Sequence, residues 1–255
     1  MAEVLAIANQ KGGVGKTTTA VNLAASLAVA EQRVLLIDLD AQCNATSGLG
    51  HAPADIERGT YSVLLGETTL GETTLGTDLP SLFVAPATPD LAAAETELAD
   101  AEDRATRLKS AIDAVRDEYD FILIDCPPSL GLITINALVA ADAVLVPMQC
   151  EYFALEGLSR LSGTIERIQG ALNERLRVSG VLLTMFDPRS NLAREVADEV
   201  RRHFHVYETV IPRNVRLAEA PSHGKPVILY DAGSRGAQGY LSLARELLGA
   251  GSEAA

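Results

Sequence analysis

Residues 10–19 read QKGGVGKTTT, and this stretch decides the fold. An apolar run precedes it at residues 4–8, and a helical pattern follows it as far as Ala30. A strand, a glycine-rich turn and a helix start form an anion site, because glycines let backbone N–H groups turn toward phosphate oxygens and the helix N-terminus adds partial positive charge. The alternative is a glycine-rich turn that arises by chance and binds nothing. The strand before it and the helix after it argue against that alternative. The stretch therefore predicts a P-loop that binds a nucleotide.

Two side chains of the loop would add contacts to the nucleotide. Lys16 can reach the β- and γ-phosphates, and the Thr17 hydroxyl can ligate Mg²⁺. The strict pattern G-x-x-x-x-G-K-[ST] fails at its first position, which is Gln10, and an extra lysine, Lys11, follows it. The residues expected to hold the nucleotide are Lys11, Gly12, Gly13, Val14, Gly15, Lys16, Thr17 and Thr18.

Residues 11–17 resemble the deviant Walker A motif of the ParA/MinD superfamily. In that family the extra lysine reaches across a dimer to the nucleotide of the partner. The resemblance therefore implies a catalytic role in trans for Lys11, beside Lys16 in the same loop. The alternative is a solvated lysine that serves only its own site. The sequence does not separate these two interpretations, although the resemblance favours the first.

Strand-length apolar runs alternate with helix-length amphipathic stretches along the whole chain. Most of the apolar runs have no polar residue inside them, as expected of strands buried on both faces. This alternation predicts an α/β fold of the P-loop NTPase type, with a mostly parallel twisted sheet and helices on both faces. The expected strands are residues 4–8, 34–37, 82–85, 121–124, 143–146, 181–184 and 227–229.

The domain organisation follows from length and composition. A chain of 255 residues can bury one large core, and no linker interrupts it, so we expect a single domain over residues 1–255. We expect a flexible tail at residues 249–255 and a surface loop at the five-residue duplication in residues 66–75. A signal peptide and long apolar runs are lacking, which favours a cytoplasmic protein. Three cysteines without C-x-x-C spacing argue against a disulfide framework or a zinc site.

Acidic residues close two of the predicted strands. Hydrolysis needs a group that orients the attacking water, and Asp40 is the catalytic candidate because it follows a strand at its ligand-facing end. The ParA/MinD superfamily has its water-activating aspartate at this place. Asp38 lies on the other side of Leu39 in the chain, and a structural role and a direct role remain open for it. Asp125 ends the run FILID, a Walker B pattern that would place it near Mg²⁺, directly or through a water.

Three further segments narrow the resemblance to the ParA/Soj subgroup. They are residues 185–192, 212–217 and 219–226, and the similarity extends from about Val4 to Leu248. The absence of an Asn-Lys-x-Asp motif favours adenine over guanine, so we expect ATP and Mg²⁺ as cofactors. The resemblance implies that Pro212 and Asn214 lie against the adenine.

The subgroup binds double-stranded DNA without sequence preference once ATP has dimerised it, and a ParB/Spo0J-type centromere-binding partner stimulates hydrolysis and release. The resemblance implies that Arg189 and Arg216 contact the DNA. A net charge of −13 counts against this partner. Yet eight Lys or Arg residues lie between Arg189 and Arg235, which allows one basic face on a nucleoid-associated protein.

Two other function classes share the P-loop. A MinD-like membrane switch requires a basic amphipathic C-terminal helix, and residues 238–248 are amphipathic but not basic. An iron–sulfur reductase requires cysteines around a cluster, and neither Cys43 nor Cys126 stands where a ligand is expected; an amide-forming ligase belongs to the same metabolic class. The sequence thus predicts an ATP-dependent chromosome or plasmid partitioning ATPase without a membrane partner. The acidic residues 95–103 are interpreted as a solvated face, or as a receptor for a basic peptide.

Overall fold

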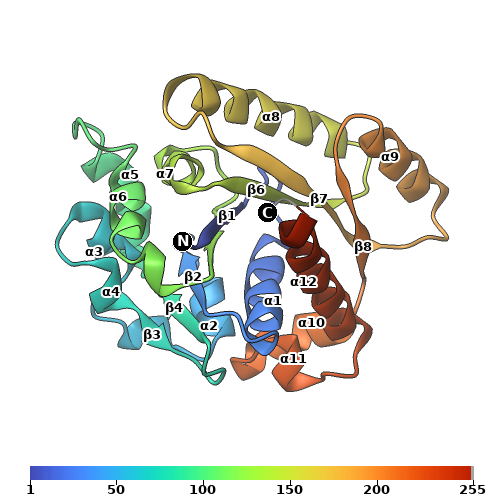
Figure 1. Cartoon of the computed structure of the whole chain (residues 1–255), viewed down its shortest axis with the longest axis horizontal. Coiled ribbons are helices and arrows are strands. Elements are labelled where there is room, and N and C mark those ends of the chain that lie inside the picture. Colours follow the sequence, from blue (N-terminus) through green and yellow to red (C-terminus); the bar gives the residue numbers. More distant parts are fainter. Residues whose placement is uncertain (254–255) are drawn as a thin grey trace.

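The computed structural model describes residues 1–253 and has one eight-stranded sheet at its centre. Its strands lie in the order β3-β4-β2-β5-β1-β6-β7-β8 (Figure 1). Only β3 and β4 pair antiparallel; every other neighbouring pair in this described part is parallel. The strands are β1 Glu3–Ile7, β2 Val34–Asp38, β3 Leu75–Gly76, β4 Leu82–Ala85, β5 Phe121–Asp125, β6 Ala143–Gln149, β7 Arg177–Phe186 and β8 Val206–Pro212.

Helices connect the strands and cover both faces of the sheet (Figure 1). α7, α8 and α9 lie on one face, and α1 and α12 lie on the other. The α-helices are α1 Lys16–Val29, α2 Asn44–Gly48, α3 Thr60–Leu65, α4 Leu70–Thr73, α5 Ala94–Glu97, α6 Arg107–Asp113, α7 Leu132–Ala140, α8 Ala154–Ala171, α9 Asn191–Arg201, α10 Val215–Glu219, α11 Val227–Tyr230 and α12 Arg235–Glu253. The 3₁₀ turns are η1 Pro53–Asp55, η2 Pro89–Ala93, η3 Arg116–Glu118 and η4 Ala220–His223.

The side chains of the central strands alternate between two cores. In β1, Val4 and Ala6 pack toward α7 and α8, while Leu5 and Ile7 pack toward α1 and α12. Both sets are apolar because a parallel strand in the middle of a sheet is covered on both faces. The expected fold class, a mostly parallel sheet with helices on both faces, is confirmed.

Two elements at the C-terminal end differ from the sequence prediction. Residues 227–229, expected to be a strand, form helix α11, whose first N–H donates to the side chain of Asn22 on α1 at 2.7 Å. A short apolar run does not distinguish a strand from a buried helix. The last strand, β8, was not predicted. It lies at the edge of the sheet, where the exposed Glu208 interrupts the apolar pattern and Pro212 is tolerated at its end.

Two further segments have more helix than expected. The duplication at residues 66–75 contains α4, which Thr69 and Glu72 close with a capping box and which Leu70 anchors in the core. Helix α12 continues to Glu253, although we expected a flexible tail from Gly249. The last two positions of that expected tail, residues 254–255, lie outside the described residues.

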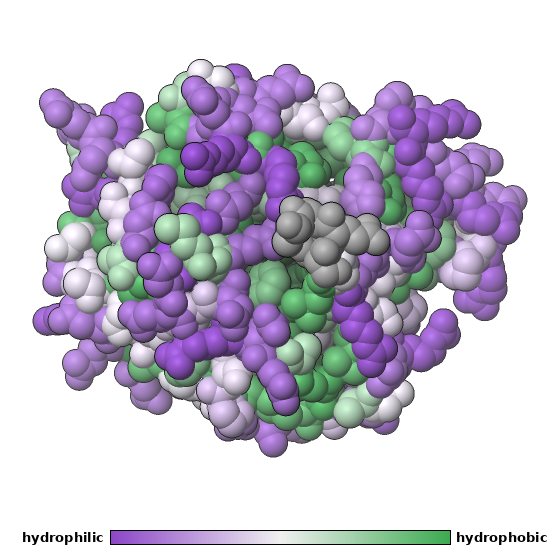
Figure 2. All heavy atoms as spheres, in the orientation of Figure 1, coloured by the Kyte–Doolittle hydropathy of each residue, from purple (hydrophilic) through white to green (hydrophobic). Residues whose placement is uncertain are grey.

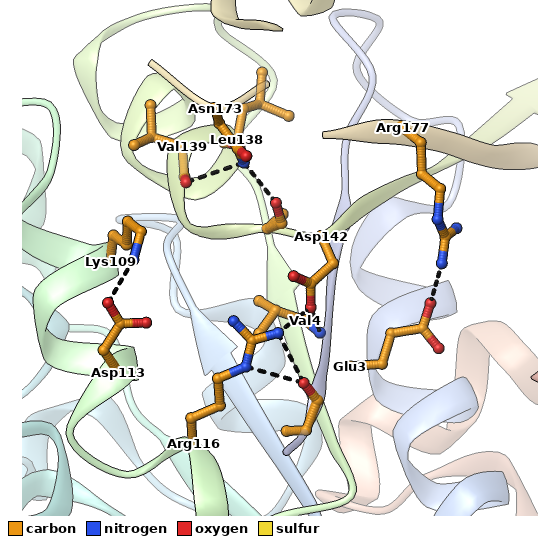
Figure 3. A network of polar contacts seen from close by, with 12 residues as sticks. Glu3, Val4, Lys109, Asp113, Arg116, Leu138, Val139, Asp142, Asn173 and Arg177 are labelled. Carbon is orange, nitrogen blue, oxygen red and sulfur yellow. Dashed lines mark hydrogen bonds and ion pairs between the residues drawn. The ribbon is translucent and has the colours of Figure 1, made fainter. Parts of the chain in front are cut away.

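A polar network fixes the amino ends of the strands, opposite the loops that follow them (Figure 3). The Asp142 carboxylate accepts the Val4 N–H at 2.8 Å and pairs with the Arg116 guanidinium. The Asn173 amide nitrogen lies 2.7–3.2 Å from three carbonyl oxygens at the end of α7. Carbonyls at a helix end have no partner inside the helix, so Asn173 supplies it.

Polar side chains cover most of the face seen in Figure 1, with a smaller apolar area over α11 and the adjoining part of α1 (Figure 2). Within residues 1–253, none of the helices combines the length and the apolar character that crossing a membrane would require.

Replacing Asn173 by Ala should lower the free energy of unfolding by roughly 1 to 3 kcal/mol, because the carbonyls that end α7 lose their partner. Urea unfolding without nucleotide would measure the change. Glu174→Ala is the matched control, since Glu174 is exposed and makes no side-chain hydrogen bond within the described chain. An equal stability of the two variants would contradict the capping role.

Candidate nucleotide site

The glycine-rich loop joins β1 to α1 and has the backbone of an anion cradle. Gly13 and Gly15 have φ angles of 73° and 87°, in the left-handed region that favours glycine. Gly15 caps α1, and its carbonyl accepts the Thr19 N–H at 2.8 Å. The Thr184 hydroxyl of β7 donates to the Val14 carbonyl at 2.7 Å. The loop is thereby held against two strands before any ligand arrives.

A cavity of about 560 Å³ opens over this loop, within the usual range for small-molecule sites. Nine of the predicted site residues line it: Gly12, Gly13, Gly15, Lys16, Thr17, Thr18, Asp40, Pro212 and Asn214. The structure therefore brings the predicted phosphate end and base end into one cavity. Lys11, Val14 and Asp125 do not line it, and neither do Arg189 and Arg216.

Lys16 lies largely buried at the floor of the cavity. Its ammonium group donates to the Lys11 carbonyl at 3.1 Å, which places it over the loop. Burial lowers the pKa of Lys16, and the nearby acidic groups, Asp125 first, oppose this shift. A phosphate would add a further negative partner and favour the charged form.

Asp125 is fully buried beneath the cavity, and neither of its carboxylate oxygens has a hydrogen-bond partner among the described residues. Burial raises the pKa of Asp125 well above its usual value, and the neighbouring Asp38 raises it further. The Thr17 hydroxyl and Lys16 act in the opposite direction. A buried polar group without a partner costs free energy, and at a functional site it indicates a missing ion or ligand.

These residues fit a Mg²⁺ ion. Thr17 and Asp125 offer the hard oxygen donors that Mg²⁺ prefers. Across residues 1–253, no group of three His, Cys, Asp or Glu side chains could hold a metal ion by itself. Such a sparse protein donor set suits Mg²⁺, which is usually bound by one or two protein groups together with substrate phosphates and water.

Asp38 holds the loop that carries Asp40. Its carboxylate accepts the Thr46 N–H at 2.9 Å, the Thr46 hydroxyl at 2.7 Å and the Asp40 N–H at 3.1 Å. The Thr46 hydroxyl in turn accepts the Ala87 N–H at 2.9 Å. Asp38 does not line the cavity. Of the two roles left open by the sequence, these contacts support the structural one.

Asp40 lines the cavity, as expected of a group that meets the attacking water. One of its oxygens accepts the Gln42 N–H at 3.0 Å, which fixes its orientation. Cys43, the next residue but two, has a φ of 56° at the start of α2. This left-handed backbone is one that glycine adopts more readily than cysteine.

Lys11 does not line the cavity, and its ammonium group forms an ion pair with Glu151, which follows the end of β6. Both side chains are partly exposed, at 37% and 45%. The sequence analysis did not identify Glu151. The one feature of the sequence that could have indicated Glu151 is its position just past the carboxyl end of a parallel strand, where ligand-binding residues are commonly found.

The base end of the cavity contains residues that the sequence analysis missed. Met185 lines it with a φ of 49°, and Tyr240 reaches it from α12. The Tyr240 hydroxyl lies 3.1 Å from the Thr19 hydroxyl of α1. Asn214 also caps α10, because its side-chain oxygen accepts the Arg216 N–H at 2.9 Å. Met185 begins the segment 185–192 that narrows the resemblance, but the sequence analysis gave it no role. No local pattern marks Tyr240, because its neighbours across the cavity are distant in sequence.

The two arginines expected to contact DNA are both exposed and ion-paired. Arg189 pairs with Asp187 at 3.0 Å. Arg216 pairs with Glu219 at 2.8 Å and with Asp231 at 3.2 Å. The acids that surround Arg216 on its own segment therefore compete with any phosphate.

Comparison with known proteins places the chain among nucleotide-binding proteins. Residues 2–178 match the family described as an AAA domain. The chain is 57% identical over 249 residues to the sporulation initiation inhibitor protein Soj of Bacillus subtilis, covering 97% of this chain and 98% of that protein. It is 55% identical to the chromosome partitioning protein ParA of Myxococcus xanthus, covering 96% and 87%.

Two solved structures share the fold over nearly the whole chain. One is cobyrinic acid a,c-diamide synthase from Mycobacterium smegmatis with bound ATP analog and magnesium, with a TM-score of 0.85, 37% identity, and coverage of 97% and 95%. The other is the Pyrococcus furiosus cell division ATPase MinD, with a TM-score of 0.82, 27% identity, and coverage of 97% and 98%.

Replacing Asp38 by Asn should make stability less dependent on pH. Burial raises the pKa of Asp38 to about 6 in the folded chain. The folded chain then binds a proton that the unfolded chain has already released, so stability is present at low pH and is lost as the pH rises through about 6. Between about pH 4 and 7, the wild type should lose roughly 1 to 3 kcal/mol more than the variant.

Urea unfolding without nucleotide, repeated across this pH range, would measure the two slopes. Asp55→Asn serves as the control and should keep the wild-type slope, because Asp55 is exposed. Equal slopes for Asp38→Asn and the wild type would contradict the assignment.

Proposed function

The chain belongs to the Soj/ParA family of chromosome-partitioning ATPases, and we propose that it works as an ATP-timed switch on DNA. Binding of Mg-ATP would make two copies dimerise and bind double-stranded DNA without sequence preference. Hydrolysis would then release the DNA. The observation that carries this proposal is that the phosphate loop and Asp40 line one cavity, while Lys11 stays out of the lining and pairs with Glu151.

In this proposal ATP would lie along the cavity, from the loop at one end to Pro212 and Asn214 at the other. Its phosphates would meet the backbone N–H groups of the loop and the Lys16 ammonium, and its adenine would lie near Pro212 and Asn214. The Thr17 hydroxyl and Asp125 would hold Mg²⁺, the latter directly or through a water. When bound, Mg²⁺ neutralises charge on the phosphate oxygens.

Asp40 would orient the attacking water and set the lifetime of the ATP-bound state. It lies in the lining of the cavity with one oxygen bound to the Gln42 N–H, so its other oxygen can accept from a water. Asp38 and Thr46 hold its loop in place. Lys16 would stabilise the negative charge that develops on the transferred phosphate.

Lys11 would act on the nucleotide of a second copy. Its side chain does not line its own cavity and, among residues 1–253, is paired only with the partly exposed Glu151. An exposed ion pair is worth about 0 to 1 kcal/mol, so a phosphate on a partner could replace Glu151 at little cost. Two exposed aromatic residues, Tyr152 and Phe153, follow Glu151 and stack edge to face.

Arg189 and Arg216 are the proposed DNA contacts, and such contacts would associate the protein with the nucleoid. Arginine–phosphate contacts give affinity that is independent of sequence and sensitive to salt. A dimer would present each contact twice, so a weak surface on one copy becomes effective on two. A ParB/Spo0J-type protein is the proposed partner that accelerates release.

The acidic stretch at residues 95–103 is partly committed inside the chain. Glu97 accepts the Tyr61 hydroxyl at 2.7 Å, and Asp103 pairs with Arg107 at 3.0 Å. Glu95 accepts the Ile133 N–H at 3.5 Å at the start of α7. These contacts favour a structural role over a receptor for a basic peptide.

The structure gives little support to a membrane switch. In α12, Tyr240, Leu243 and Ala244 are buried against the sheet. Glu246 of the same helix accepts the backbone N–H groups of Glu208 and Thr209 at 2.7 and 3.0 Å. A helix docked in this way has no apolar face left over these residues for a lipid surface. The other alternative, an amide-forming ligase, is supported by the likeness to cobyrinic acid a,c-diamide synthase, which is 37% identical to this chain. The identity to Soj is higher, at 57%, and favours the partitioning function.

Asp40→Ala should lower ATP turnover about 100-fold or more, because the water loses its orienting group. The variant should still bind ATP and remain on DNA after the wild type has dissociated. Release of phosphate and dissociation from random-sequence duplex DNA would be followed in parallel. Asp55→Ala is the exposed control and should behave as the wild type. Normal hydrolysis by Asp40→Ala would refute the assignment.

Lys11→Ala should abolish dimerisation with a non-hydrolysable ATP analogue while leaving each monomer folded. Light scattering after size exclusion would measure the mass. Lys109→Ala is a matched control, because Lys109 is another partly exposed lysine in an ion pair, here with Asp113. If Lys11 serves only its own site, the variant will still dimerise once the analogue saturates it.

A further inference from the structure

A second hollow, of about 550 Å³, adjoins the nucleotide cavity and shares Pro212 and Arg213 with its lining. Three arginines from three separate segments line it. Arg189 comes from the loop between β7 and α9, Arg213 follows β8, and Arg235 begins α12. The other lining residues are Phe186, Asp187, Pro188 and Pro212.

The charge of this hollow is positive although the chain carries a net charge of −13. Its one acid, Asp187, is already paired with Arg189. Arg213 and Arg235 are both exposed, and neither side chain makes an ion pair or hydrogen bond with any described residue. Two guanidinium groups in one hollow therefore remain without an anionic partner.

The surroundings of the hollow define where an anion would lie. Ser234 caps α12 by accepting the Ala237 N–H at 3.2 Å, and the positive end of this long helix begins at Arg235. A neighbouring hollow shares Arg235 but contains the exposed Glu208. Repulsion from that carboxylate favours the end near Arg213.

Arg216, in contrast, is held by two carboxylates. Glu219 and Asp231 lie 2.8 and 3.2 Å from its guanidinium nitrogens. A phosphate would have to replace both of them, whereas at Arg213 and Arg235 it would replace only water. The chemistry of two unpaired guanidinium forks suits a phosphate oxygen pair.

We propose that Arg213 and Arg235, together with Arg189, form a seat for a backbone phosphate of double-stranded DNA, and that this seat contributes more to DNA affinity than Arg216. This inference rests on the proposed DNA binding and names the residues that would contact the DNA. The segment from Pro212 to Asn214 then contributes to both sites, since it lines the nucleotide cavity and reaches the hollow through Arg213.

Binding to random-sequence duplex DNA, measured by fluorescence anisotropy with a non-hydrolysable ATP analogue across a salt series, tests the seat. Arg235→Ala should weaken binding about tenfold and flatten the log–log salt slope by about one to two, one lost phosphate contact for each copy in the dimer. Arg235→Lys should restore part of the affinity. Arg213→Ala should weaken binding similarly, and Arg216→Ala should weaken it less.

Arg175→Ala is the matched control, because Arg175 is also exposed and makes no ion pair within the described residues. It should bind DNA as the wild type does. ATP hydrolysis without DNA should be unchanged in Arg235→Ala, whose side chain does not line the nucleotide cavity.

The possible failures are distinguishable. If the wild type binds no DNA with the analogue at any salt, the proposed function fails. If it binds, and Arg235→Ala and Arg213→Ala bind equally well while Arg216→Ala does not, the seat is refuted and the proposed function stands. Binding of inorganic phosphate, measured at matched ionic strength, tests whether the hollow is instead a site for free phosphate. If the wild type binds free phosphate, and Arg235→Ala loses that binding but keeps its DNA affinity, the inference is also overturned.

Discussion

Two carboxylates buried side by side at the carboxyl ends of β2 and β5 constrain the rest of the site. Asp38 and Asp125 are paired in register and are fully buried. Placing two acids together in a low-dielectric interior is unfavourable, so the surrounding chain must compensate for it. Asp38 is compensated within the protein by donors from Thr46 and Asp40. Asp125 is offset only in part, by the nearby Thr17 hydroxyl and Lys16, and neither of its oxygens has a hydrogen-bond partner of good geometry among the described residues, which favours an ion brought with the nucleotide.

This unequal compensation separates a rigid part of the site from a part that awaits a ligand. The Asp38 side chain ties the loop after β2 to Thr46, which binds the segment after β4 through Ala87. The water-orienting candidate, Asp40, is thus mounted on a fixed loop. The two apolar cores on either side of the sheet supply the stability that allows the unpartnered carboxylate to persist.

The sequence predicted those features that depend on neighbours along the chain. The glycines, Lys16 and Thr17 lie close together in the sequence, and the central strands are continuous apolar runs, so the loop and the sheet could be predicted from the sequence. Features that depend on residues distant in the sequence could not be predicted in this way. Glu151 meets Lys11 only because β6 lies beside β1, and Tyr240 meets Thr19 only because α12 packs on α1. β8 escaped notice because an edge strand tolerates polar residues.

The two hollows adjoin, which gives the proposed switch a short physical route between ATP and DNA. Pro212 and Asn214 border the nucleotide cavity, and Arg213 between them also borders the arginine-lined hollow. α10 begins at Val215 and is capped by the Asn214 side chain, so a ligand that moved Asn214 would also move the helix that carries Arg216. In the proposed switch, a base bound against this segment would act directly on the position of these guanidinium groups, without a relay through the core.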